Sequence, residues 1–358
     1  MDKLTNILLN LPRRTQLILF FCVILFIGYF LSKAIFTNYS ATNQGEQVVQ
    51  KYTCPFNYKM YTLHTIPKDR NNVCGFEIDE GDNPMGIAPI SKSLIHLDQL
   101  LIQDQDDANI PPQIGNLQSM TTLIIADTDG EIGIPPEIGD LKNLSSLEIS
   151  KNEEIETLPV SVAKLTNLKT LLIRYNPKLE VPDSLVSLPN LVTLGVLGQN
   201  IKVIPVKVYL LKKLQTLNYS YNEISKVSPD IDAMTSLQQI NLQGNKLKTF
   251  PEVDKLQNLQ LLDLSNSNLS SLPAGVEKLK KLTSLHASGN KLDDHAVENV
   301  SQLTQLISLD LGDNKLTKIP PGLEKLQKLQ YLRLSGNNIN VADAVSLKQK
   351  LPHTTIDF

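Results

Sequence analysis

One pattern of residue spacing recurs about every 23 positions through most of this 358-residue chain. Its clearest copy is LQKLQYLRLSGN, residues 326–337, in which leucines alternate with polar residues and an asparagine closes the pattern. We call this closing polar residue the register residue. Eleven copies are in phase, 22 to 24 positions apart, with register residues Gln105, Thr128, Asn152, Asn176, Gln199, Asn222, Asn245, Ser267, Asn290, Asn314 and Asn337. Such a repeat predicts one extended array rather than several globular domains.

Apolar residues precede each register residue by eight, five and three positions, as Leu306, Leu309 and Leu311 precede Asn314. The last two alternate with exposed positions at a period of two, which predicts a short strand with one buried face. One copy cannot bury that face alone, so consecutive copies must stack. The sequence therefore predicts an α/β solenoid with a parallel sheet on its concave face.

The register asparagine stands where the strand ends in a bend. Its side-chain amide can pair with backbone groups that the bend would otherwise leave unsatisfied. We therefore expect a structural ladder of amides, formed by Asn152, Asn176, Asn222, Asn245, Asn290, Asn314 and Asn337. A proline then suits the outer return segment, where a missing N–H costs little, and it is found as Pro159, Pro205, Pro251, Pro273 and Pro320.

These repeats resemble those of the leucine-rich repeat family over residues 94–341. The segments IPPQIGNL and IPPEIGDL look like the plant-type variant, whereas TLPVSVAKL and SLPAGVEKL look like the short bacterial and animal variant. The resemblance implies a curved horseshoe of about eleven repeats that binds partners, usually proteins. It implies no cofactor, and we expect a monomeric array. A composition rich in Lys, Asn, Gln and Ile, without Trp, suits a low-GC bacterium.

The N-terminus predicts a membrane anchor. Residues 1–14 carry Lys3, Arg13 and Arg14. Residues 15–32 are uncharged and mostly apolar, and an extension to residue 36 past Lys33 gives a length sufficient for one transmembrane helix, residues 15–36. The basic residues predict a cytoplasmic tail at 1–14 and repeats outside the cytoplasm, on a single-pass protein of the cytoplasmic membrane. The polar residues 37–52 are interpreted as a linker. The alternative is a cleaved signal peptide and a secreted protein, which the long apolar run and the lack of a clear cleavage site disfavour.

Residues 53–93 are interpreted as an N-terminal cap, because a solenoid needs a cover for its first open core edge. Cys54 and Cys74 flank its first part, and on the exported side of a membrane they are expected to form a disulfide. Two free buried thiols are the alternative. A zinc site is disfavoured, because His64 is the only histidine nearby.

Two return segments have helical spacing. After Asn290 the segment KLDDHAVENVSQL has no proline and predicts a helix on the outer face. Residues 342–358 are interpreted as the C-terminal cap, with a helix in NVADAVSLKQK and a closing strand at Thr355–Phe358.

The sequence gives little support to catalysis. It contains no Walker loop, GxSxG, HExxH or kinase signature. A net charge of −3 argues against nucleic acid as the main partner. The two remaining hypotheses are a membrane-anchored binding protein and a secreted effector or inhibitor, each with a protein or peptide ligand.

The candidate binding residues lie on the concave face, four, two or one positions before the register residues. They are Leu101, Ile124, Leu172, Arg174, Tyr175, Leu197 and Tyr221. Exposed apolar residues on a rigid sheet are typical of binding surfaces. Tyr175 and Tyr221 are two strands apart, with Gly195 and Gly198 between them, so they predict a slot about 10 Å wide that is floored by backbone. The alternative is that the tyrosines shield the sheet edge and the glycines relieve crowding.

A charged row is expected further along the same face, where Asp263, His286, Asp310 and Arg333 follow one another on successive strands. This row could hold a metal or shuttle a proton. We interpret it as a surface row of alternating charge, and we assign no metal site.

Overall fold

The computed structural model describes residues 59–78, 82–103, 109–128, 133–180 and 188–358. All the described residues belong to one compact unit. The predicted tail, membrane span and linker, residues 1–52, lie outside them. Within the described ranges, no helix has both the length and the apolar character needed to cross a bilayer.

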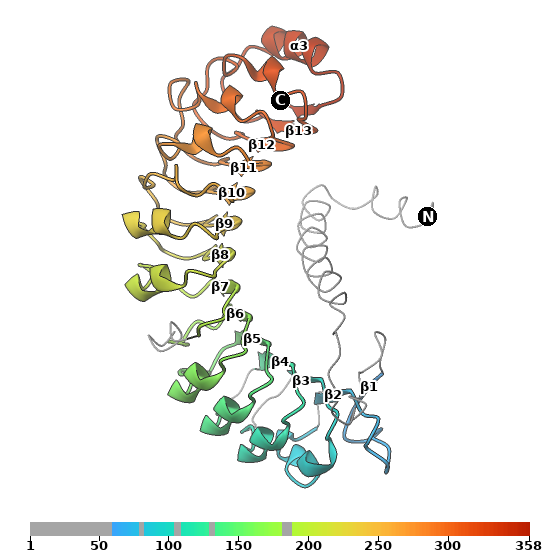
Figure 1. Ribbon diagram of the computed structural model, residues 1–358. Coiled ribbons are helices and arrows are strands. Elements are labelled where there is room, and N and C mark those ends of the chain that lie inside the picture. Colours follow the sequence, from blue (N-terminus) through green and yellow to red (C-terminus); the bar gives the residue numbers. More distant parts are fainter. Residues whose placement is uncertain (1–58, 79–81, 104–108, 129–132, 181–187) are drawn as a thin grey trace, which may run out of the picture. The chain divides into compact units, whose positions relative to one another are not determined.

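The described residues form a sheet of fourteen parallel strands that follow one another in chain order (Figure 1). Strands β3 to β13 carry the eleven repeats, β1 and β2 precede them in the predicted cap, and β14 follows them. The strands are β1 Met60–Tyr61, β2 Gly75–Ile78, β3 Gln99–Gln103, β4 Thr122–Thr128, β5 Ser146–Asn152, β6 Thr170–Arg174, β7 Thr193–Leu197, β8 Thr216–Asn218, β9 Gln239–Asn241, β10 Leu261–Asp263, β11 Ser284–His286, β12 Ser308–Asp310, β13 Tyr331–Arg333 and β14 Thr355–Asp357.

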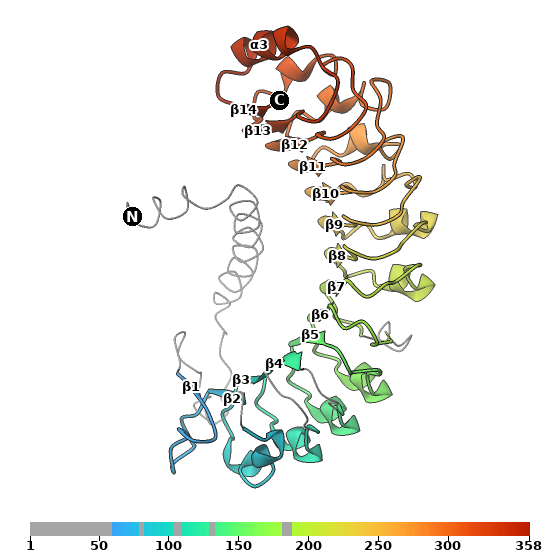
Figure 2. The same ribbon diagram turned by 180° about the vertical axis from the view of Figure 1, so that it is seen from behind.

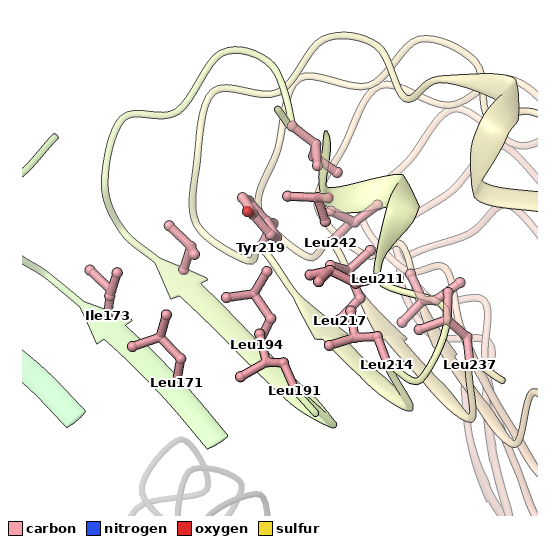
Figure 3. Packing of buried hydrophobic residues seen from close by; sticks show 14 of the residues in the cluster. Leu171, Ile173, Leu191, Leu194, Leu211, Leu214, Leu217, Tyr219, Leu237 and Leu242 are labelled. Atoms are coloured by element: carbon pink, nitrogen blue, oxygen red, sulfur yellow. The ribbon is translucent and has the colours of Figure 1, made fainter. Parts of the chain in front are cut away.

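Within this unit the strands line the inner side of a curve and the return segments lie on its outer side (Figure 2). The register between neighbouring strands places equivalent residues of successive repeats opposite each other: Leu171 is opposite Leu194, and Leu194 is opposite Leu217. These leucines are almost fully buried and stack from turn to turn (Figure 3). Burying one such side chain contributes about 1.5–3 kcal/mol, so each added turn stabilises its neighbours.

The return segments are mostly short 3-10 helices. Pro159 immediately precedes one of them, where a backbone N–H would have no helical partner. They are η1 Pro84–Ile87, η2 Ser91–Ser93, η3 Pro112–Asn116, η4 Pro136–Asp140, η5 Val160–Lys164, η7 Val206–Leu210, η8 Pro229–Ala233, η9 Val276–Lys278, η10 Val300–Gln302 and η11 Leu323–Lys325.

The prediction of a helix after Asn290 was wrong. Residues 294–299 form turns that lead into η10, with three-residue hydrogen bonds such as Val300 N to Val297 O. Hydrogen bonds that close over three residues form 3-10 turns, which are frequent as short connectors, whereas an α-helix closes its bonds over four. The C-terminal helix is confirmed as α3, Val341–Lys350, which Asn340 caps by accepting a bond from the N–H of Ala342. The closing strand is confirmed as β14.

The predicted cap contributes to the sheet. β1 pairs with β2 and β2 pairs with β3, with Phe76 and Ile78 fully buried. Cys74, immediately before β2, is buried. Cys54 lies outside the described residues, so the pairing of Cys54 with Cys74 stays a prediction.

The register asparagines bond to backbone groups of two successive turns. Asn245 Nδ2 donates to the carbonyl oxygens of Tyr219 (2.9 Å) and Leu242 (2.8 Å), and its Oδ1 accepts from the N–H of Ile224 (2.9 Å). Bonds of the same kind are made by Asn222, Asn290, Asn314 and Asn337. Asn152 Nδ2 likewise donates to the carbonyl oxygens of Ile125 (3.3 Å) and Ser150 (3.0 Å), and it also donates to Asn176 Oδ1 at 2.9 Å. Asn176 Nδ2 donates to the carbonyl oxygen of Ile149 at 3.0 Å. Within the described residues, the hydroxyl of Ser267 makes no hydrogen bond. Gln105 lies outside them.

Candidate recognition surface on the concave face

The solvent side of the sheet is organised in rows, because equivalent residues of successive strands lie opposite one another. The row four positions before the register residues begins with Leu101, Ile124, Glu148, Leu172 and Gly195. It continues through Asn218, Asn241, Asp263, His286, Asp310 and Arg333. The predicted apolar and charged segments therefore occupy two halves of one continuous face.

Strand length changes between these halves. β3 to β7 have five to seven residues, whereas β8 to β13 have three. In four of the short strands the row residue is Asn or Asp, and its Oδ1 accepts a bond from the N–H two residues later at 2.9–3.0 Å: Asn218 from Ser220, Asn241 from Gln243, Asp263 from Ser265 and Asp310 from Gly312. Such an Asx turn occupies an N–H that a longer strand would use, so it ends the strand.

The row side chains of β3 to β7 cannot make this turn in the same way. Leu101, Ile124, Leu172 and Leu197 are partly exposed on the longer strands. The Asn and Asp side chains of four short strands bond to their own backbone, while the apolar side chains of the long strands remain available for a partner.

Arg174 lies among these apolar residues. Its Nη1 is 3.5 Å from Oε1 of Glu148 on the neighbouring strand, and its side chain is 39% exposed. Its Nε is buried and, among the described residues, has no hydrogen-bond partner. The exposed part of this guanidinium, and not the buried Nε, offers donors to a carboxylate of a ligand.

Tyr175 and Tyr221 both have left-handed backbone, with φ of 53° and 55°, and their side chains are about half exposed at 48% and 49%. Burial raises the pKa of Tyr221, and the neighbouring Tyr175 hydroxyl and Asp263 raise it further.

The predicted slot between the tyrosines was wrong. The ring of Tyr175 lies against Gly198, and a methyl group on Gly195 would lie 2.7 Å from Cδ2 of Leu172. The ring of Tyr221 lies in the same way against Gly244, where an added methyl group would be 2.8 Å from its Cδ1. The glycines are thus covered by side chains and form no floor. Each tyrosine spans its own turn and the next, which makes an aromatic ridge beside Leu197 and Arg174.

The charged row is placed as the sequence predicts. His286 Nδ1 is 3.7 Å from Asp263 Oδ2, and Arg333 Nη1 is 3.6 Å from Asp310 Oδ1. Arg333 also donates to Asp313 at 2.5 Å. In the described part of the chain, no three His, Cys, Asp or Glu residues are grouped so that they could hold a metal ion. Asp263 is buried and His286 is nearly buried, whereas Asp310 and Arg333 are partly exposed, so the row consists of side-chain pairs between neighbouring strands.

Two features of this face escaped sequence reasoning. The Asx turns had a signal, because Asn or Asp stands at the same repeat position in four copies. The contact of each tyrosine with the glycine of the next turn also had a sequence signal, because Tyr and Gly alternate at positions 175, 198, 221 and 244.

Models of leucine-rich repeats match residues 189–247, 258–279 and 304–348. No curated protein matches the chain. Among solved structures, the internalin InlF of Listeria monocytogenes has a TM-score of 0.63 at 20% identity, over 79% of this chain and 78% of the internalin.

Two receptors have the same fold. A TDR receptor aligns with a TM-score of 0.62 at 27% identity, over 75% of this chain and 48% of the receptor. The plant peptide hormone receptor RGFR1 in complex with RGF2 aligns with a TM-score of 0.56 at 21% identity, over 74% and 50%. The chain therefore spans about half the length of these receptors. Together with the repeat matches, the comparisons show a leucine-rich repeat fold.

Proposed function

We propose that this protein is a membrane-anchored binding protein that presents the concave face over β3 to β7 to a protein or peptide outside the cytoplasm. The observation that carries the proposal is the contrast along one row of the sheet. Asn and Asp in the short strands bond to their own backbone, whereas Leu101, Ile124 and Leu172 in the long strands are partly exposed without such a role.

The ridge of Tyr175 and Tyr221 adds aromatic contact area at the edge of this surface. Aromatic side chains on a rigid framework lose little entropy on binding and are enriched among binding hot spots. Arg174 supplies an anchor for an acidic group of the partner. A peptide partner also agrees with the fold of the plant peptide hormone receptor, whose structure contains RGF2.

The anchor is proposed from residues 1–36 alone, where three basic residues precede an apolar segment. Secretion after cleavage remains the second candidate, because a basic start and an apolar stretch also suit a signal peptide. The two differ in one measurement. The anchored protein keeps an N-terminus near Met1 and sediments with membranes, whereas the secreted protein begins near residue 42.

Orientation is tested by adding protease to wall-free, intact cells that express the full chain. We expect the repeats to be digested, because the tail with Lys3, Arg13 and Arg14 stays inside. If the repeats remain protected from protease until the membrane is lysed, the protein has the opposite orientation.

The binding surface is tested by photo-crosslinking in the cells that make the protein. A photoreactive amino acid replaces Leu172 in one variant and Ser284 in a matched control, since both lie on the solvent side of strands, in β6 and β11. We expect a crosslinked protein or peptide only at position 172. Crosslinking at 284 alone would place the binding surface in the other half of the array.

A further inference from the structure

A second surface lies on the outer side of the array, around η7. Val203, Val206 and Leu210 belong to one return segment, and their side chains are 62%, 68% and 66% exposed. They lie three and four residues apart, and we call them the η7 patch. Three large aliphatic side chains that a single turn leaves in solvent favour contact with an apolar partner.

Neighbouring turns are polar at two of these positions. The position of Val203 is occupied by Glu180 in the turn before and by Lys226 in the turn after, and Lys226 pairs with Val203 in an isolated β-bridge. The position of Leu210 carries lysine in four other turns: Lys164, Lys255, Lys278 and Lys325. The array does not need aliphatic residues here for its own packing.

The surroundings of the η7 patch are basic. The exposed lysines near it in the same and the following return segment are Lys202, Lys207, Lys212, Lys213 and Lys226. The nearby acids are Glu180, Glu223, Asp230 and Asp232. Glu223 pairs with Lys246 and Asp232 with Lys255, both at 2.7 Å, and Asp230 accepts a bond from the hydroxyl of Ser228. With Lys246 and Lys255 included, seven lysines face four acids, so the surface has a positive balance.

We propose that the η7 patch docks onto a membrane surface that contains anionic phospholipids. Aliphatic side chains enter the region between headgroups and acyl chains, while lysine stems extend along them and place the ammonium groups among the lipid phosphates. A second copy of this chain would bring an equally basic surface against the patch, so charge complementarity favours the anionic lipid. This site is independent of the concave face and of the partner proposed for it.

The chain contains no tryptophan, which allows a direct test. Val206→Trp places a unique fluorophore in the η7 patch of the full chain. Val345→Trp is the matched control, because Val345 is 59% exposed on α3 with Lys348 and Lys350 nearby. Each variant is reconstituted into lipid nanodiscs of phosphatidylcholine, with or without phosphatidylglycerol. The N-terminal segment is present in every sample and cancels from the comparison.

We expect the emission of Val206→Trp to shift to the blue, with reduced acrylamide quenching, only in discs that contain phosphatidylglycerol. The emission of Val345→Trp should be unchanged. Leu210→Gln, added to Val206→Trp, should remove the shift and still fold, since polar residues occupy that position in other turns. The pair Lys202→Gln and Lys226→Gln should reduce the ratio of docked to free protein by about tenfold or more, because each lysine near an anionic surface adds about a fivefold preference.

Three results would overturn the proposal. One is the absence of a shift, and another is an equal shift for Val345→Trp. The third is a shift that grows with protein concentration in neutral discs, which would assign the η7 patch to a second copy of the chain.

Discussion

The ring of Tyr175 occupies the space where a side chain of Gly198 would begin: a methyl group added to Gly198, the residue at the equivalent position one turn later, would lie 2.4 Å from Tyr175 Cδ1. Both residues have positive φ, 53° and 62°, and both stand immediately before a register residue. The relationship recurs every second turn: Tyr221 covers Gly244, Asn266 covers Gly289 and Asp313 covers Gly336. From β6 onward the turns are therefore paired, since the side chain of one turn fills the space that the glycine of the next leaves open.

Gly198→Ala should be strongly destabilising for this reason. Left-handed backbone costs an alanine about 1–2 kcal/mol, and the added methyl group collides with Tyr175. We expect a loss of about 2–4 kcal/mol in the free energy of unfolding, measured by urea denaturation. In a Tyr175→Ala background the same change should cost less, because only the backbone strain remains. An equal cost in both backgrounds would disprove the contact.

Binding should depend on the aromatic ridge. Tyr175→Ala and Tyr221→Ala should each weaken the affinity for the crosslinked partner by about 2 kcal/mol or more, as aromatic hot spots do. His286→Ala should cost much less, because His286 lies in the charged row of the other half. Titration calorimetry gives the affinities, and thermal unfolding checks that each variant is folded. If both tyrosine variants bind the partner normally and substitutions in the charged row abolish binding, the binding site lies in the other half of the array.

The repeat spacing was sufficient to predict the parallel sheet, its register and the eleven repeats, because a buried leucine at a fixed spacing leaves stacking as the only way to cover it. It could not give the conformation of the segment after Asn290, since apolar residues at helical spacing also fit successive 3-10 turns. Side-chain direction was the second limit. The sequence placed Tyr175 and Tyr221 two strands apart, but only the structure shows that both rings lean onto the following glycine and fill the predicted slot.

The register asparagines provide a stability test. Asn245→Leu removes the partners of the Tyr219 and Leu242 carbonyl groups and of the Ile224 N–H, all of which are buried in the array. We expect a cost of about 1–3 kcal/mol for groups left unpaired. Ser267→Ala is the matched control at the same repeat position, because its hydroxyl makes no hydrogen bond with the described residues, and it should be close to neutral. Similar costs in urea denaturation would contradict this account of the asparagines.

The pH dependence of stability should include Asp294. The hydroxyl of Thr317 donates to its carboxylate at 2.5 Å, and the N–H groups of Thr317 and Lys318 add bonds of 2.8 and 3.1 Å, so the pKa of Asp294 is held below its ordinary value. A lowered folded-state pKa stabilises the fold above the unfolded pKa of about 3.9, and this contribution is lost as the pH falls through the folded value.

Asp294→Asn should therefore lower the free energy of unfolding at pH 7 by about 1 kcal/mol, a low value because the carboxylate is partly exposed. The difference in unfolding free energy between this variant and the parent should shrink below about pH 4. It should vanish once the Asp294 carboxyl group is protonated in both the folded and the unfolded protein. Asp293→Asn is the neighbouring control. It removes a charge at the adjacent position, where Asp293 Oδ1 accepts a bond from the N–H of Ala296. A difference that stays constant from pH 7 to strong acid would exclude titration of Asp294 as its cause.

The cap should depend on a disulfide between Cys54 and Cys74. Cys74 is buried beside β2, whose strand joins the cap to the first repeat, so a link at this point restrains the end of the array. The chain has three cysteines. Maleimide labelling of the denatured, unreduced full chain should find one thiol, at Cys22, and reduction should expose all three. Reduction should also lower the melting temperature, since losing such a bond typically costs about 2–5 kcal/mol. Peptide mapping that finds Cys74 bonded to Cys22, or three thiols before reduction, would refute the pairing and weaken the argument for an oxidising compartment.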